Sequence, residues 1–99
     1  MSSINIDKII DTYRKLGLET RVIDDEPGFV HEAHRHSGVR LYTLSGSAGV
    51  KLDNKEWLEV KTGDEIIIKD DQLHEAVAGD KGWVYIFAAS SEEMMSQGI

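Results

Sequence analysis

The stretch GFVHEAHRHSGVRLYTLSG, residues 28–46, contains three of the four histidines of the 99-residue chain. Between its terminal glycines it is rich in Val, Leu, Tyr and Thr, which favour β-strands. Because side chains alternate between the two faces of a strand, we expect His34 and His36 to share one face with Glu32, and His31 to point to the other. Two imidazoles on one face can hold a metal ion, but they need at least one further ligand from elsewhere.

His74 is the candidate third ligand, because it is the only histidine outside this stretch and the chain contains no cysteine. It lies in GDEIIIKDDQLHEA, residues 63–76, where a strand-like run and a polar turn lead into another strand-like run. A barrel would bring this position beside His34 and His36. The alternative is that these are unrelated surface histidines in a charged protein, since the pattern His-x-His alone is common by chance.

Most of the remaining sequence consists of short strand-like segments separated by turn residues. The eight segments are LETRVI, FVHEAHRH, VRLYTLS, AGVKL, EWLEV, DEIIIK, LHEAVA and WVYIFAA. A hairpin turn is expected at Asp53-Asn54-Lys55, between two of them. This pattern predicts an all-β domain, an antiparallel sandwich or barrel, over about residues 18–89.

A helix is expected over about residues 6–16, ahead of the strands. Its apolar residues recur at helical spacing and are Ile6, Ile9, Ile10, Tyr13 and Leu16. Asn5 is a suitable N-cap and Gly17 a suitable C-terminal stop. The tail, residues 90–99, is compatible with a short helix capped by Ser90 or Ser91, or with a frayed end. We therefore expect residues 1–99 to form one domain with a short N-terminal helix.

Acidic residues outnumber basic ones by 18 to 11, which gives a formal net charge of −7. Such a balance repels a phosphate backbone, and we find no basic cluster, so the sequence argues against nucleic-acid binding. No apolar run approaches the roughly 18 residues of a membrane helix, and the N-terminus lacks the features of a secretory signal. Together with the absence of cysteine, this favours a cytoplasmic protein without membrane partners.

Two motifs in the chain resemble those of the cupin superfamily. Gly28, five further residues and His34-Arg35-His36 resemble the start of the first motif, and residues 42–46, YTLSG, resemble its end. Gly63-Asp64, followed by an apolar run, a turn and His74, resembles the second motif. The resemblance covers about residues 25–89. Within the superfamily, the sequence is similar to the small single-domain cupins of the cupin 2 type.

The resemblance implies a jelly-roll β-barrel with a metal near its centre. His34, His36 and His74 would be the ligands of one divalent transition metal, and Fe, Mn, Ni and Zn all accept imidazole. Three protein ligands would leave positions open for water, a substrate or dioxygen. Cupins with three histidines and no carboxylate ligand exist as a class.

The chain departs from the family pattern in two places. Lys69 and Asp71 stand where the second motif usually has Pro and Gly, and Asp tolerates turn conformations. The first motif usually supplies a Glu ligand, but that position is Arg40 when counted from His36 and Val39 when counted from Gly46. Glu32 is displaced by ~6–7 Å along the strand, so it is better placed to accept an imidazole N–H than to bind the metal; the alternative is a solvated side chain.

Arg40, Tyr42, Glu32 and Tyr85 are the candidate residues of a pocket beside the metal. An inward Arg40 would anchor a substrate carboxylate or replace the charge of the metal, whereas an outward Arg40 would be a surface residue. Counting from His36 places Arg40 on the inner face of its strand, whereas counting from Gly46 places it on the outer face. Tyr42 lies two residues further along and therefore shares the face of Arg40. Tyr85 lies on one face of the last strand with Trp83 and Phe87, and such an aromatic row is also typical of a core.

Three functions remain open at this point. The first is a metal-dependent enzyme, such as a dioxygenase, lyase or isomerase, that acts on a small and perhaps carboxylate-bearing molecule. The second is a non-catalytic cupin that binds or senses a small ligand without a tightly bound metal. The third is an inactive jelly roll that kept both motifs for folding. The helix face and the exposed strand edges favour a homodimer.

Overall fold

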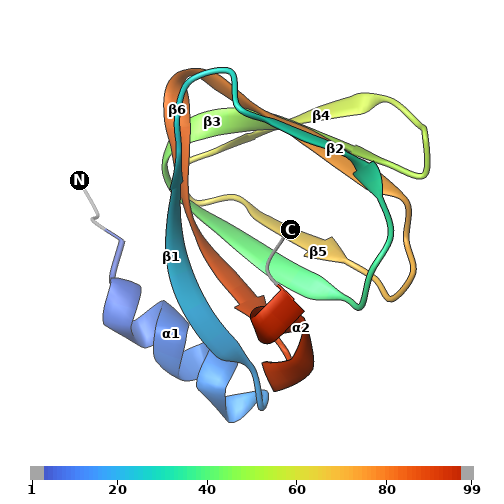
Figure 1. The fold of residues 1–99 in the computed structure, drawn as a ribbon. Helices are drawn as coiled ribbons and strands as arrows, with labels where there is room; N and C mark the ends of the chain where they lie inside the picture. The colour runs from blue at the N-terminus through green and yellow to red at the C-terminus, as the bar shows by residue number, and fades with distance from the viewer. Residues whose placement is uncertain (1–3, 97–99) are drawn as a thin grey trace.

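Two long antiparallel strands, β3 (Val39–Leu52) and β6 (His74–Ala89), form the frame of the computed structural model, which describes residues 4–96 (Figure 1). They pair along nearly their whole length. Each contains two of the segments predicted from the sequence, so the eight segments form six strands.

The prediction that turn residues separate all eight segments is therefore wrong at residues 45–47 and 78–82, because both stretches are irregularities inside continuous strands. The β3–β6 register shifts on either side of Gly46, and Gly46 and Gly82 adopt positive φ. A Cβ at Gly46 would lie only 2.1 Å from the carbonyl oxygen of Gly82. Two glycines thus allow the long strands to bend and cross closely without breaking, as β-bulges commonly do.

The shorter strands pair with successive halves of the two long ones. β1 (Glu19–Asp25) and β2 (Val30–His34) pair with β6, while β4 (Trp57–Lys61) and β5 (Glu65–Ile68) pair with β3. Every pairing is antiparallel, and the sheet curls into a jelly-roll barrel (Figure 1). The all-β prediction is confirmed.

Alternation along β3 and β6 fills the barrel with large side chains. Leu41 and Thr43 point inward from β3, and Trp83, Tyr85 and Phe87 point inward from β6. The rings of Trp83 and Tyr85 stack at 3.9 Å, and Trp83 Nε1 donates a hydrogen bond of 3.0 Å to Thr43 Oγ1. Each buried large side chain contributes about 1.5–3 kcal/mol of hydrophobic free energy. The aromatic row on β6 is therefore core.

Helix α1 (Ile6–Lys15) packs on the outside of the barrel, as its apolar face predicts. Its Tyr13 is 2% exposed and lies against Ile86 and Ala88 of β6. The ends of the predicted face are open, because Ile6 and Leu16 are 42% and 54% exposed. Tyr13 donates a hydrogen bond to Glu65, and burial followed by this contact raises the pKa of the Tyr13 phenol.

Both predicted ends of α1, and one of the two caps predicted for a C-terminal helix, are also found. The Asn5 side chain accepts a hydrogen bond of 3.1 Å from Lys8 N, and Gly17 has a φ of 81°. Helix α2 (Ser91–Ser96) begins where Ser90 Oγ accepts a hydrogen bond of 3.2 Å from Glu93 N, so Ser90 is its cap. Neither helix in residues 4–96 has the length and apolarity that crossing a membrane requires.

The predicted hairpin between β3 and β4 turns at Asp53 and Asn54. Both residues have positive φ, 53° and 60°, and Lys55 N donates a hydrogen bond of 3.0 Å to Leu52 O. This is the turn type whose twist matches paired antiparallel strands.

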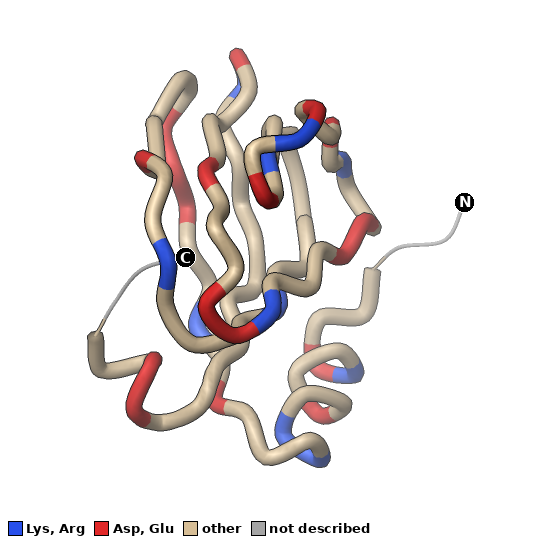
Figure 2. Tube along the Cα trace, turned by 90° about the vertical axis from the view of Figure 1, so that its right-hand side faces the viewer, with Lys and Arg blue, Asp and Glu red and all other residues tan. Residues whose placement is uncertain are grey.

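Elsewhere, Figure 2 shows acidic and basic residues close together in α1, where Lys15 Nζ lies 3.0 Å from Asp11 Oδ2.

Candidate metal centre

Three histidines converge at one end of the barrel. His34 ends β2, His36 lies in the loop that follows it, and His74 begins β6 directly opposite His34. One ring nitrogen from each lies within 4.8 Å of the others. His74 is 1% exposed, whereas His34 and His36 are partly buried. The structure therefore brings together the three residues that the two sequence motifs predict as ligands.

Backbone carbonyls orient all three imidazole rings in the same way. Nδ1 of His34 lies against Glu32 O, Nδ1 of His36 is 2.6 Å from Ser37 O, and Nδ1 of His74 is 2.8 Å from Gln72 O. A carbonyl oxygen can only accept, so each Nδ1 carries a proton and donates it. In a neutral ring the lone pair then belongs to Nε2. This is the usual way in which a protein prepares histidines for a metal.

The contact between His36 and His74 tests whether a cation fits. Their Nε2 atoms are 3.1 Å apart, although Nδ1 already carries the proton of each neutral ring. Two lone pairs at this distance repel unless a proton or a cation lies between them. Two nitrogens bound to one ion at about 2.0–2.1 Å would be about 2.9–3.4 Å apart. The donor set thus fits a divalent transition metal, with His34, His36 and His74 as its ligands.

His31 does not point to the opposite face, as simple alternation predicted. It pairs with Ala76 and His34 pairs with His74, and these two partners share the inner face of β6. An irregularity between His31 and His34 resets the parity, so that both face the interior. His31 nevertheless lies outside the group of three, because its Nε2 is 2.6 Å from Asp25 Oδ2.

Tyr85 belongs to a polar cluster that it forms with Asp25 and His31, and not to the histidine centre. Its hydroxyl donates a hydrogen bond of 3.1 Å to Asp25 Oδ2, the oxygen that also contacts His31. Burial, and then the charge of Asp25, raises the pKa of the Tyr85 phenol. Tyr85 is fully buried in the barrel core.

Arg40 and Tyr42 lie on the outer face of β3. Their neighbour Leu41 is 1% exposed in the core, so the even-numbered side chains point the other way. Arg40 pairs with Ala88, and Tyr42 packs in the cluster beneath α1. Neither residue lines the histidine centre, because the inward position belongs to Val39, the alternative obtained by counting from Gly46.

Glu32 contributes its backbone to the site. Its carbonyl accepts from His34 Nδ1, whereas its side chain is exposed. The structure places another carboxylate, that of Glu93 in α2, beside His36, and Glu93 is only 7% exposed. Its Oε1 lies 3.7 Å from His36 Nδ1. The sequence offered no signal for this contact beyond an acidic residue in the first turn of a possible helix.

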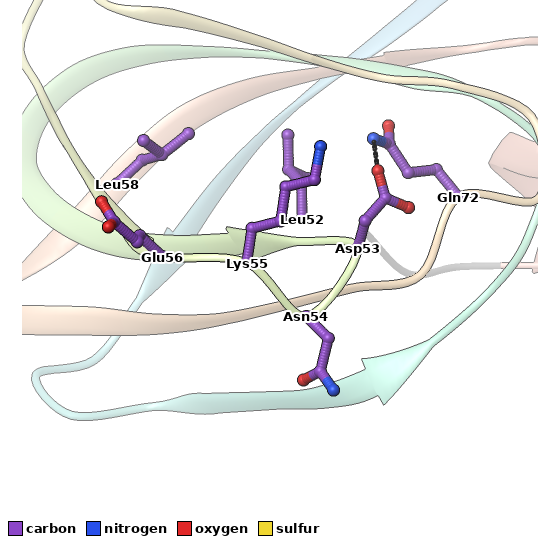
Figure 3. Close-up of a pocket in the computed structure, with 7 residues that line it drawn as sticks. All are labelled: Leu52, Asp53, Asn54, Lys55, Glu56, Leu58 and Gln72. Atoms are coloured by element: carbon purple, nitrogen blue, oxygen red, sulfur yellow. Dashed lines mark hydrogen bonds between the residues drawn. The ribbon is translucent and has the colours of Figure 1, made fainter.

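A pocket of about 770 Å³ lies at the β3–β4 hairpin (Figure 3). Leu52, which pairs with His74, and Leu58 give it an apolar wall. Gln72 lies on another side, and its Nε2 donates a hydrogen bond of 2.8 Å to Asp53 Oδ2. The backbone carbonyl of this same Gln72 holds His74. The pocket and the centre thus share structural residues.

An antiparallel jelly roll with three converging histidines defines a cupin. More narrowly, the chain belongs to the family of the AraC-like ligand binding domain, whose model matches residues 16–89. No curated protein sequence is significantly similar to it.

Solved structures agree on the fold. KdgF from Halomonas sp. has a TM-score of 0.63 and 20% identity, over 80% of this chain and 84% of that one. An RmlC-like cupin from Shewanella frigidimarina has a TM-score of 0.66 and 22% identity, over 79% and 71%. The DMSP lyase DddQ from Ruegeria pomeroyi has a TM-score of 0.66 and 16% identity, over 73% and 37%. Identities this low show a common fold only.

Proposed function

We propose that this chain is a metal-binding cupin that takes a small molecule in the pocket beside its three-histidine centre. The observation that carries the proposal is the common orientation of His34, His36 and His74. Three carbonyls bind Nδ1, which would leave Nε2 of each ring as the ligand nitrogen. A chance group of surface histidines would have no reason to share this orientation, and His74 would not be buried.

A divalent metal held here would supply a Lewis acid and, if it is redox-active, one-electron chemistry. The chain's own residues would do the rest. Leu52 and Leu58 would offer apolar surface to a ligand on one side of the pocket, while Asp53 and Gln72 would present polar groups to it. A dioxygenase, a lyase and an isomerase are all compatible with such a site. Arg40 lies on the outer face of β3, so it is not placed to anchor a substrate carboxylate beside the metal.

The second candidate is a non-catalytic module that binds a small ligand without needing the metal. The family match favours it, because the family is described by ligand binding. Ligand binding that survives removal of the metal with a chelator would support this candidate, and loss of ligand binding would support the first.

We also propose that two copies associate, as expected from the sequence. Large apolar side chains remain exposed on several strands, among them Val22, Trp57 and Ile67, at 51%, 49% and 48%. A second copy is one way to cover such surface. Light scattering on the purified protein should give twice the chain mass, and a monomer at all concentrations would contradict this proposal.

Metal analysis of protein purified without a metal-affinity tag tests the main proposal. We expect about one equivalent of Fe, Mn, Ni or Zn per chain in the wild type. His34→Ala, His36→Ala and His74→Ala should each lose most of it, because two imidazoles bind far more weakly than three. His31→Ala is the matched control and should keep its metal. Equal metal content in all four variants would contradict the proposal.

A further inference from the structure

We infer that Glu93, in the C-terminal helix α2, is a positioning residue for the metal centre and supplies the negative charge that the first motif lacks. This inference rests on the proposed metal binding. The motif position for a Glu ligand holds Val39 on the inner face of β3, so no carboxylate comes from there. Glu93 lies near the C-terminal end of the described residues and faces the Nδ1 side of the His36 ring.

The carboxylate of Glu93 is held firmly beside His36. Its Oε1 accepts a hydrogen bond of 2.9 Å from Ser37 N and lies 3.7 Å from His36 Nδ1. Its Oε2 accepts a hydrogen bond of 2.6 Å from Ser96 Oγ. The 3.7 Å contact is within ion-pair range but too long for a hydrogen bond, and Ser37 O takes the Nδ1 proton. Glu93 therefore acts on His36 through its charge and through the Ser37 peptide.

Charge explains why a carboxylate at this place matters. Three neutral imidazoles leave a bound dication with its full charge, and a buried charge without a counter-ion is costly. Glu93 is 7% exposed, so water screens its field only weakly. Its position on the Nδ1 side makes the His36 ring a stronger donor at Nε2. Among residues 4–96 the Glu93 carboxylate accepts hydrogen bonds from Ser37 N and Ser96 Oγ, and a bound cation would add an opposite charge close to it.

This arrangement couples the docking of α2 to metal binding. Apart from Glu93, α2 is held by the packing of Met94, which is 8% exposed, and by a long hydrogen bond of 3.4 Å from Arg21 Nη2 to Met94 O. Ser91 adds a contact to Glu19. Because coupling between two binding events is reciprocal, a metal that gains from Glu93 must also tighten α2 on the barrel.

Glu93→Gln tests the inference, with Glu92→Gln as its control. The amide oxygen of Gln can still accept from Ser37 N, so E93Q removes the charge and keeps the packing. Glu92 is an exposed residue of the same helix, and E92Q makes the same change of charge. We expect competition against a chelating dye to show that E93Q binds Zn²⁺ or Ni²⁺ about 10- to 100-fold more weakly than E92Q and the wild type.

Hydrogen exchange of the α2 amides distinguishes the proposed coupling from a role of Glu93 in packing alone, because packing alone would not make the exchange depend on the metal. In the wild type, added metal should slow exchange of the α2 amides, and in E93Q this metal-dependent protection should be reduced. Equal affinities of E93Q and E92Q, or metal binding to the wild type without added protection of α2, would overturn the inference. The wild-type exchange experiment decides the matter even if E93Q does not fold. A wild type that binds no metal would instead overturn the proposed function, and with it this inference.

Discussion

Tyr85→Phe removes one hydroxyl from the cluster that it forms with Asp25 and His31. The buried Asp25 then loses a donor at 3.1 Å and keeps His31 at 2.6 Å. Removing a donor from a buried charged acceptor costs about 1.5–3 kcal/mol. For a domain of this size each kcal/mol lowers Tm by about 4–8 °C, so the variant should melt roughly 6–24 °C below the wild type at neutral pH.

The same substitution should matter less at high pH, and the sign follows from the raised pKa of the Tyr85 phenol. In the unfolded chain a tyrosine releases its proton near pH ~10. The folded wild type keeps that proton, so the unfolded state binds fewer protons above this pH and wild-type stability falls by up to about 1.4 kcal/mol per pH unit. The Tyr85→Phe variant lacks this loss. The gap between the two proteins should therefore shrink by about 2 kcal/mol at about pH 11.5.

Urea unfolding followed by tryptophan fluorescence can measure both effects, at pH 7 and between about pH 9.5 and 11.5. Tyr13 also has a raised pKa, but it is present in both proteins and cancels in the difference. Tyr42→Phe, on the outer face of β3, is the control for loss of a hydroxyl outside the cluster. A gap that does not change with pH would refute the claim that Tyr85 is held protonated. No gap at pH 7 would refute the hydrogen bond to Asp25.

Three further changes test the fold and the placement of side chains. Ile10→Asp, on the face of α1 that packs on the barrel, should destabilise the protein by about 1.5–3 kcal/mol in urea unfolding. Asp11→Asn, on the exposed face of the same helix, should change the stability little. Equal effects of the two substitutions would contradict the packing of α1. Gly46→Ala should lower the stability by more than about 2 kcal/mol, because its Cβ would meet Gly82 O. Gly63→Ala has a similar φ of 91° but nothing within 4 Å of its Cβ, so it should lower the stability less. Thermal melting compares the two, and the reverse order would disprove the close approach of β3 and β6 at Gly46. Arg40→Met should leave metal content unchanged, because Arg40 lies outside the barrel, and a change in metal content would show that it reaches the centre.

Local signals in the sequence predicted most elements of this fold. Asn5 and Gly17 mark the ends of α1, Asp53 and Asn54 form the hairpin turn, and each of the eight apolar segments overlaps a strand. The segments around Gly46 merged into longer strands because a glycine there bends the chain without ending its pairing. Turn residues in a sequence cannot by themselves separate a bulge from a loop.

The grouping of the three candidate ligands was predictable from the sequence, and their surroundings were not. Motif spacing was sufficient to group His34, His36 and His74. Strand parity failed for His31, because a single irregularity in β2 reverses it. The approach of Glu93 was not predictable, since it depends on how α2 folds back after β6, and no local pattern encodes such a long-range contact.

The most direct test of the central claim is anomalous diffraction from crystals grown with Ni²⁺ or Zn²⁺. We predict one strong peak per chain, about 2.0–2.3 Å from Nε2 of His34, His36 and His74, with each Nδ1 still on its backbone carbonyl. A peak bound through Nδ1, a peak that omits His74, or no peak among these three rings would contradict the account.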